Sequence, residues 1–211
     1  MRRRFVLGVA GFILVLFFFR DPVTLALLSH SSAARPDPSS APAQTEDSRA
    51  PFEHSAGGRR YRITPRFRWD QSAEVVGARP YRWGATGALI PEDLALAWGA
   101  VLQPPFVGNV SYSQFTRFYF WRTKDLSLDR GAIVSHSANV HIIPRSLRVR
   151  RAVRSVSTGD LVRLEGWLVD VEGIDDTGFR WATSATREDE GPGSCETVYL
   201  ERLTVGERAY E

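Results

Sequence analysis

The alternation of hydrophobic and polar side chains is clearest between Gly159 and Val171, where β-branched and aromatic residues dominate. Apolar side chains occupy even positions before Gly166 and mainly odd positions after it. Because the side chains of a strand alternate between its two faces, this change predicts either a bulge or bend at Gly166 or burial of both faces beyond it. We expect a β-strand here, and the folded part of the chain to be built around it.

Further strands are predicted on both sides of this stretch. Residues 60–69 alternate apolar residues with arginine, and Pro65, which cannot donate to a ladder, predicts an edge strand. Other strands are expected near residues 74–83, 117–122, 179–185 and 195–203. The run at 117–122 is apolar on both faces, which predicts a central place in the sheet.

Two short helices complete the expected fold. Residues 91–99 begin with proline, carry acids in their first turn and end in glycine. Residues 145–156 place valines and a leucine at helical spacing among arginines. The predicted class is therefore a β-rich α+β domain, with a small antiparallel sheet or a partly closed barrel and one or two short helices.

The N-terminal segment predicts a membrane anchor or an export signal. Arginines at positions 2–4 precede a run of fifteen apolar residues, Phe5 to Phe19. Positive charge at this end favours retention of the N-terminus in the cytoplasm and export of the rest. A transmembrane helix from Phe5 to Leu28 is long enough to span the bilayer if Arg20 reaches the interface. A cleaved signal peptide is the alternative, because residues 31–33 are small.

The retained anchor is favoured, since a charged pair and a proline at residues 20–22 are unusual inside a signal-peptide core. Residues 29–58 are rich in Pro, Ser and Ala, which predicts a disordered linker. The expected organisation is thus an anchor at 1–28, a linker at 29–58 and an extracytoplasmic domain at 59–211. We therefore predict a single-pass protein of the bacterial inner membrane, with its C-terminal domain in the periplasm.

The charge distribution argues against a nucleic-acid partner. The formal net charge is +3, but from Ala34 onward 23 basic residues balance 23 acidic ones. Residues 59–82 carry seven arginines against two acids, and residues 160–211 carry 13 acids against five arginines. We expect these two oppositely charged segments to form ion pairs within the fold.

The densest polar cluster is the segment from Ser135 to His141, which includes His136 and Asn139. Two histidines five residues apart point away from each other on a strand and on a helix, so one metal ion would need both of them in a loop. The favoured interpretation is that these side chains brace a turn between strands, with no metal or other cofactor.

Cys195 is the single cysteine, which excludes an intrachain disulfide. It follows a glycine-rich loop that carries Arg187 and Asp189, and it precedes Glu196. With His136 or His141 as a base, Cys195 would be a catalytic candidate. A small buried hydrophobic residue is the favoured interpretation of a lone cysteine that begins a strand. Arg187 with Asp189 or Glu196 would then form a structural ion pair.

Three segments carry a resemblance to a known group of proteins: residues 135–144, residues 159–166, and residues 187–196. Together they resemble an uncharacterised family of membrane-anchored bacterial envelope proteins, over roughly residues 67–203. The resemblance implies an envelope location and a shared architecture, and it implies no activity. Where members of that family carry Ser-Ser-Leu, this chain has Thr183, Ser184 and Ala185.

These observations predict a non-catalytic binding or assembly module held at the membrane through residues 5–28, with an envelope protein as its partner. Asn139, Arg187, Asp189 and Glu196 are the candidate binding residues. The alternative is an envelope hydrolase or transferase that uses Cys195 with a histidine. The chain has no phosphate-binding glycine loop, no Gly-x-Ser-x-Gly and no His-Glu-x-x-His sequence, which favours the first hypothesis.

Overall fold

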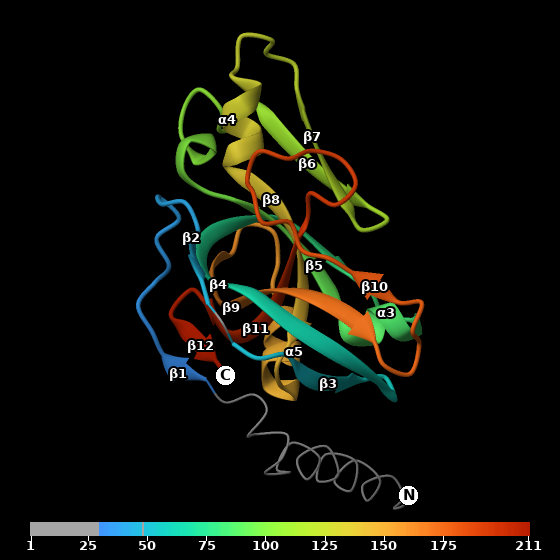
Figure 1. The fold of residues 1–211 in the computed structure, drawn as a ribbon. Coiled ribbons are helices and arrows are strands. Elements are labelled where there is room, and N and C mark those ends of the chain that lie inside the picture. Colours follow the sequence, from blue (N-terminus) through green and yellow to red (C-terminus); the bar gives the residue numbers. More distant parts are fainter. Residues whose placement is uncertain (1–29, 48) are drawn as a thin grey trace, which may run out of the picture.

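The computed structural model describes residues 30–47 and 49–211 (Figure 1). The strands are β1 (Ser31–Ser32), β2 (Ala43–Glu46), β3 (Phe52–Ala56), β4 (Arg59–Pro80), β5 (Glu92–Ala97), β6 (Val110–Phe115), β7 (Phe118–Thr123), β8 (Ser137–Pro144), β9 (Leu161–Gly173), β10 (Arg180–Trp181), β11 (Glu196–Val205) and β12 (Arg208–Tyr210). The helices are α3 (Gly84–Leu89), the 3₁₀ helix η1 (Gly99–Leu102), α4 (Arg130–Ser135) and α5 (Leu147–Val153). The predicted anchor at residues 5–28 lies outside the described residues, and no helix within them is long and apolar enough to cross a membrane.

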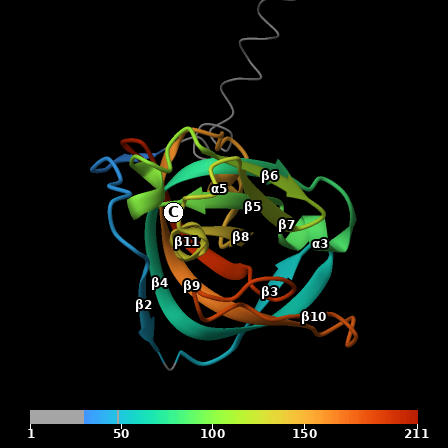
Figure 2. The ribbon, with the colours of Figure 1, turned by 90° about the horizontal axis from the view of Figure 1, so that it is seen from above.

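The prediction of a β-rich fold with few helices is confirmed, as a large mixed sheet and a separate two-stranded sheet formed by β6 and β7. The large sheet is not wholly antiparallel, because β8 and β11 pair in parallel. Five of its strands form a ring of pairings, in which β4 pairs with β5, β5 with β8, β8 with β11, β11 with β9, and β9 with β4. In Figure 2, β4 curves around the outside of the domain and β5, β8 and β11 lie within its curve.

The strand predicted at 159–171 is β9, and both of its faces are buried beyond Gly166. Leu164 and Leu168 belong to the core inside the ring, whereas Trp167 and Val169 pack in a second core on the opposite face. The alternation along β9 therefore never changes phase, and the extra residues lie in its two neighbours, between Leu200 and Arg202 of β11 and between Pro65 and Phe67 of β4. A Cβ on Gly166 would sit 2.2 Å from the carbonyl oxygen of Tyr199, so the close approach of these two strands requires glycine.

The strand predicted at 60–69 is the first half of β4, but it is not an edge strand. It pairs with β9 on one side and with β3 and β2 on the other. Pairing with β3 ends at Ile63 and pairing with β2 begins at Phe67, so Pro65 falls between the two short strands. Its missing N–H therefore costs no ladder hydrogen bond.

The helix predicted at residues 91–99 is wrong, and the strand predicted at 117–122 is present but is not central in the sheet. Residues 91–99 form β5 instead of a helix, because all six residues of β5 are buried between β4 and β8 and this environment outweighs the helix propensity of alanine and leucine. Residues 117–122 fall largely in β7, which lies in the small sheet and leaves Phe118 and Phe120 exposed. The amphipathic helix expected at 145–156 is present as α5, and the Ser146 side chain accepts a hydrogen bond from the N–H of Val149.

The segment at 29–58, expected to be a disordered linker, contains β1, β2 and β3. Strands β1 and β2 bury little side-chain area and are held mainly by backbone pairing, β1 with β12 and β2 with β4. Strand β3 also pairs with β4, and it packs Phe52 and Ala56 against the second core. Composition alone misses such strands, because the backbone of any residue except proline can join a ladder.

The two oppositely charged segments pair within the fold, as expected. Arg60 Nη2 lies 2.9 Å from Asp175 Oδ1 and Arg68 Nη1 lies 2.7 Å from Glu201 Oε2. A third pair joins the same two segments with the charges exchanged: Arg163 Nη2, from the acidic segment, lies 2.6 Å from Asp70 Oδ2, from the basic one. These pairs are partly exposed, so each contributes at most about 1 kcal/mol to stability.

Glu92, the first residue of β5, is buried with only 3% of its surface exposed. Its carboxylate forms no hydrogen bond or ion pair with any residue in the described part of the chain. Loss of hydration raises the pKa of Glu92 from 4.5 to about 7, against the opposing effect of Arg154. The charged form of this residue therefore destabilises the fold.

Glu92→Gln is expected to remove a destabilisation that grows with pH. The folded-state pKa of Glu92 lies above its ordinary value. Glu92 therefore costs the fold nothing below pH 4.5, where it is neutral, and the free energy of unfolding falls as the pH rises through about 7. The loss amounts to about 3 kcal/mol at most. Thermal unfolding followed by circular dichroism should give the variant a higher Tm than the parent at about pH 8 and an equal Tm at about pH 4. Glu207→Gln, at an exposed site, is the control and should show no such pH dependence.

Candidate functional site

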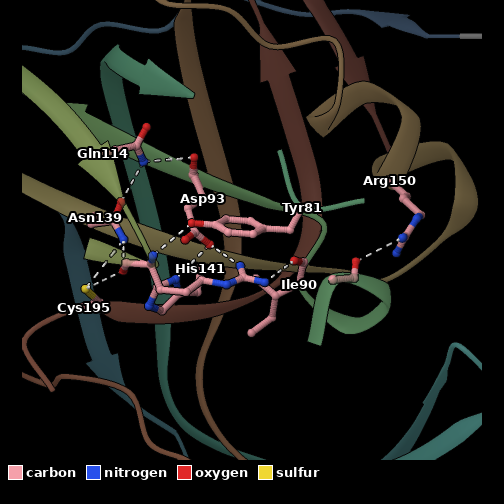
Figure 3. Close-up of polar contacts among 10 residues, drawn as sticks. Tyr81, Ile90, Asp93, Gln114, Asn139, His141, Arg150 and Cys195 are labelled. Atoms are coloured by element: carbon pink, nitrogen blue, oxygen red, sulfur yellow. Dashed lines mark hydrogen bonds and ion pairs between the residues drawn. The ribbon is translucent and has the colours of Figure 1, made fainter. Parts of the chain in front are cut away.

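A group of polar side chains lies on the outer face of the ring, where β5 and β8 run side by side (Figure 3). Leu94 and Val140 point into the ring core, so the alternating residues Asp93, Asn139 and His141 point outward. These three side chains are nevertheless between 97% and 99% buried, because the turn of the β6–β7 hairpin covers Asp93 and Asn139 and the Trp181 ring packs against His141. We call Tyr81, Asp93, Gln114, Arg117, Asn139 and His141 the Arg117 cluster.

Arg117 at the hairpin turn is the centre of this cluster. Its Nη1 donates to Asp93 Oδ1 at 2.7 Å, and its Nη2 donates to the carbonyl oxygen of Ile90 at 3.1 Å. The guanidinium stacks on the ring of Tyr81, and the Tyr81 hydroxyl accepts the Arg117 backbone N–H at 3.0 Å. Thr116 and Arg117 have φ values of 44° and 71°, so a non-glycine turn is held in a left-handed conformation by these contacts.

The other outward side chains of β5 and β8 complete the attachment of the hairpin. His141 Nδ1 lies 2.9 Å from Asp93 Oδ1, and its ring packs edge-on against Trp181. Asn139 donates to the carbonyl oxygen of Arg117 at 3.0 Å, and its own Oδ1 accepts from Gln114 at 2.8 Å. The Arg117 cluster thus holds the hairpin in one orientation relative to the ring.

A cavity of about 580 Å³ lies beside the hairpin, between β7 and the β10–β11 loop (residues 182–195). All six residues of β7 line it, and the opposite wall comes from the loop, from Arg187 to Cys195, and from Glu196. Ser137 and Ala138 also line it, at the start of β8. We call this cavity the β7 groove.

Four of the predicted site residues line the β7 groove: Arg187, Asp189, Cys195 and Glu196. Arg187 forms an ion pair with Glu196 and also donates to Gln44 of β2. Asp189 accepts a hydrogen bond from Ser184 at 2.7 Å. Burial raises the pKa of Glu196 to about 7 despite the adjacent guanidinium. These contacts fix the loop wall of the groove.

The two candidate histidines do not line the groove. His136 Nδ1 lies 3.0 Å from the carbonyl oxygen of Ala132, within the end of α4. His141 belongs to the Arg117 cluster, as described above. Among the described residues, Cys195 Sγ has only two hydrogen-bonding neighbours, Asn139 Nδ2 at 3.6 Å and the carbonyl oxygen of Arg117 at 3.8 Å.

The chemistry of Cys195 follows from this environment. Burial raises the pKa of the thiol to about 11, and the hydrogen bond from Asn139 only partly opposes this effect. A nucleophilic cysteine needs the opposite, a lowered pKa and a base within hydrogen-bond reach. Within residues 30–47 and 49–211, no group of three or more His, Cys, Asp or Glu side chains is arranged to hold a metal ion.

No sequence pattern marks Tyr81, Asp93, Gln114 or Trp181 as a site residue, and the pattern around Arg117 predicts only a strand. Asp93 was assigned to a helix terminus, which hid its outward position on β5. One pattern could have pointed to the hairpin: two six-residue β segments separated by Thr116 and Arg117. That turn lacks the glycine or asparagine that usually marks a two-residue hairpin connection.

Arg117→Ala is expected to lower the free energy of unfolding by about 3–5 kcal/mol, because it leaves the Asp93 carboxylate buried without its cation. Urea titration followed by tryptophan fluorescence would measure the change. Arg62→Ala is the matched control, since Arg62 is exposed and has no ion pair among the described residues. The control should stay within about 0.5 kcal/mol of the parent. Equal effects of the two substitutions would contradict the role given to Arg117.

Cys195 is expected to react slowly with a soluble disulfide reagent in the native protein. A pKa near 11 instead of 9.0 leaves about a hundredfold less thiolate at neutral pH, and burial slows access further. The rate can be followed by absorbance for the native chain and for the same chain in urea. A native rate equal to the unfolded rate would mean that the thiol is open and activated.

Comparison with known proteins adds no relative to this picture. No family model matches the chain, and neither does any curated protein or solved structure. The resemblance to membrane-anchored envelope proteins therefore stays a prediction from the sequence.

Proposed function

We propose that this chain is a membrane-tethered binding or assembly module of the bacterial envelope, and that the β7 groove holds its partner. One observation carries the proposal: the groove is walled by aromatic side chains that remain exposed, with Phe118 at 39% and Phe120 at 49%. Exposed large apolar side chains gathered at a concave surface are typical of interaction sites. The predicted tether at residues 5–28 would present this surface on the far side of the inner membrane.

We also propose that the five-stranded ring is the partly closed barrel expected from the sequence. In chain order its strands are β4, β5, β8, β9 and β11, and around the ring they follow the order first, second, third, fifth, fourth. Helix α5 lies between the third and fourth strands. This arrangement supports a likeness in topology to oligonucleotide- and oligosaccharide-binding (OB) folds, which is an analogy of fold and not of function.

The analogy favours a ligand other than nucleic acid. OB folds bind oligonucleotides on the face of their second and third strands. Here those strands are β5 and β8, and their outward residues Asp93, Asn139 and His141 are buried beneath the hairpin and Trp181. The open surface lies instead along β7. The balance of basic and acidic residues from Ala34 onward also favours a ligand other than nucleic acid, because nucleic-acid-binding surfaces are usually rich in basic residues.

Catalysis by Cys195 with a histidine is the weaker candidate. It would need His136 or His141 to leave its present hydrogen bonds and approach the thiol. Both rings are held by neighbouring groups, and the pKa of Cys195 is raised. Binding therefore accounts for the groove with fewer changes to the observed contacts.

The proposal can be tested by site-specific photocrosslinking in intact cells of the native host. The full-length chain would carry a photoreactive phenylalanine analogue at Phe120, in the groove, or at Leu147, an apolar and more exposed site on α5 outside it. We expect a discrete adduct of one size from Phe120 and none from Leu147. The same adducts from both positions, or none from either, would refute a partner in the groove.

A further inference from the structure

Strand β7 has one paired edge and one free edge. It pairs with β6 through residues 118–123, and the two-residue turn joins Phe115 to Phe118. Residues that flank such a turn exchange both backbone hydrogen bonds, and the pattern alternates along an antiparallel pair. Phe118, Phe120 and Arg122 therefore direct their backbone groups toward β6.

The intervening residues Tyr119, Trp121 and Thr123 direct their N–H and C=O groups away from β6. On that side they form no backbone hydrogen bond with any residue that the structure describes. Unpaired groups on a strand edge are a template for another strand, and proteins usually cover or shorten such edges.

The β7 groove runs along this free edge. It is lined by every residue of β7 and by no residue of β6, so it lies beyond the unpaired side of the strand. Because the groove touches residues of both faces of β7, the open space faces the edge itself. A neighbouring strand would lie about 4.8 Å from β7 in that direction.

We propose that the β7 groove receives an extended segment of a partner polypeptide, which adds to β7 as the third strand of the small sheet. This inference rests on the proposed function and names the partner class and its mode of binding. The β10–β11 loop forms the opposite wall of the groove, so a single extended chain fits where a second folded sheet would meet the loop. Strand addition gives affinity through main-chain bonds and specificity through alternate side chains.

The charged side chains that line the groove indicate which charge the partner segment should carry. Arg122 and Arg130 line the groove and have no acidic partner among the described residues. Three of the four acids that line the groove accept hydrogen bonds already, namely Asp125, Asp189 and Glu196. A partner segment with an acidic residue opposite Arg122 would therefore be complementary.

The exposed face of β7 indicates which residues the partner segment should carry at its other positions on that face. On an added strand, the side chains opposite Phe118 and Phe120 would lie on the same face of the small sheet as Arg122. Apolar residues at those positions would cover two exposed aromatic rings. The segment we infer is extended, apolar at alternate positions, and acidic at the position facing Arg122.

The test uses the full-length chain purified in detergent and peptides selected on it from a displayed random library. A Phe120→Asp variant serves for counter-selection, so that only groove-dependent peptides are kept. With the best peptide bound, the amides of Tyr119, Trp121 and Thr123 should exchange hydrogen at least about tenfold more slowly. The amides of Phe118 and Phe120, already bonded to β6, should change little.

A second measurement isolates the backbone contribution. N-methylation of alternate peptide amides should weaken binding by about five- to tenfold for each bond removed, and methylation of the intervening amides should not. In the protein, Trp121→Pro removes an edge donor together with the indole, whereas Trp121→Ala removes only the indole. The proline variant should bind the peptide more weakly than the alanine variant by a similar factor.

The outcomes separate this inference from the proposed function. A peptide that binds in the groove without slowing the three edge amides would overturn strand addition and leave a binding groove in place. A library without groove-dependent peptides would also overturn it, and the crosslink from Phe120 would still decide the proposed function. Edge amides that slow with rising protein concentration, in the absence of peptide, would identify a second copy of this chain as the occupant.

Discussion

The ring of strands depends on the close approach of β9 to its neighbour β11 at Gly166. Strand β9 pairs with β4 along one edge and with β11 along the other, and these two pairings complete the ring. At Gly166 the carbonyl oxygen of Tyr199 occupies the space that a Cβ would need. The extra residue of β11 follows at this point, and the strands beyond it share a second core around Trp167. Gly166 thus permits the pairing of β9 with β11 on which the ring depends, while Trp167 beside it packs in a separate core on the other face of β9.

The face of the ring formed by β5 and β8 creates the second constraint. Buried polar groups need partners, and Asp93, Asn139 and His141 all project from this face. Arg117 supplies partners for two of them from the hairpin turn, with its side chain bonded to Asp93 Oδ1 and its carbonyl oxygen bonded to Asn139. Satisfying the polar face therefore fixes the hairpin, and the fixed hairpin forms one wall of the β7 groove. The position of the groove is a consequence of the polar composition of β5 and β8.

The parts of the fold that the sequence predicted are those set by local patterns. The strand around Gly166, helix α5 and the pairing between the charged segments follow from alternation, helical spacing and charge. The strand β5 was mistaken for a helix because its alanines and leucines have helical propensity, and only its neighbours β4 and β8 override it. The Arg117 cluster depends on contacts across many residues, such as Arg117 with Asp93, and no local pattern announces them. Of the candidate site residues, the groove brought together those that were already neighbours in sequence, from Arg187 to Glu196, and it excluded His136.

Most strand edges in the described part of the structure are paired or short, and β7 differs from them. Strand β4 carries β2 and β3 along the side away from β9, and β12 carries β1, so backbone pairing covers these edges even where few apolar side chains are available. Strand β10 is only two residues long, which limits what could pair with it. Among the described residues, β7 differs in combining six residues, exposed aromatic side chains and an open space along its unpaired side. An edge of this kind invites association unless something occupies it. Since the Arg117 cluster attaches the hairpin beside the β10–β11 loop, the unpaired edge opens into the β7 groove instead of into bulk solvent, and this placement is the reason we propose a specific partner for it.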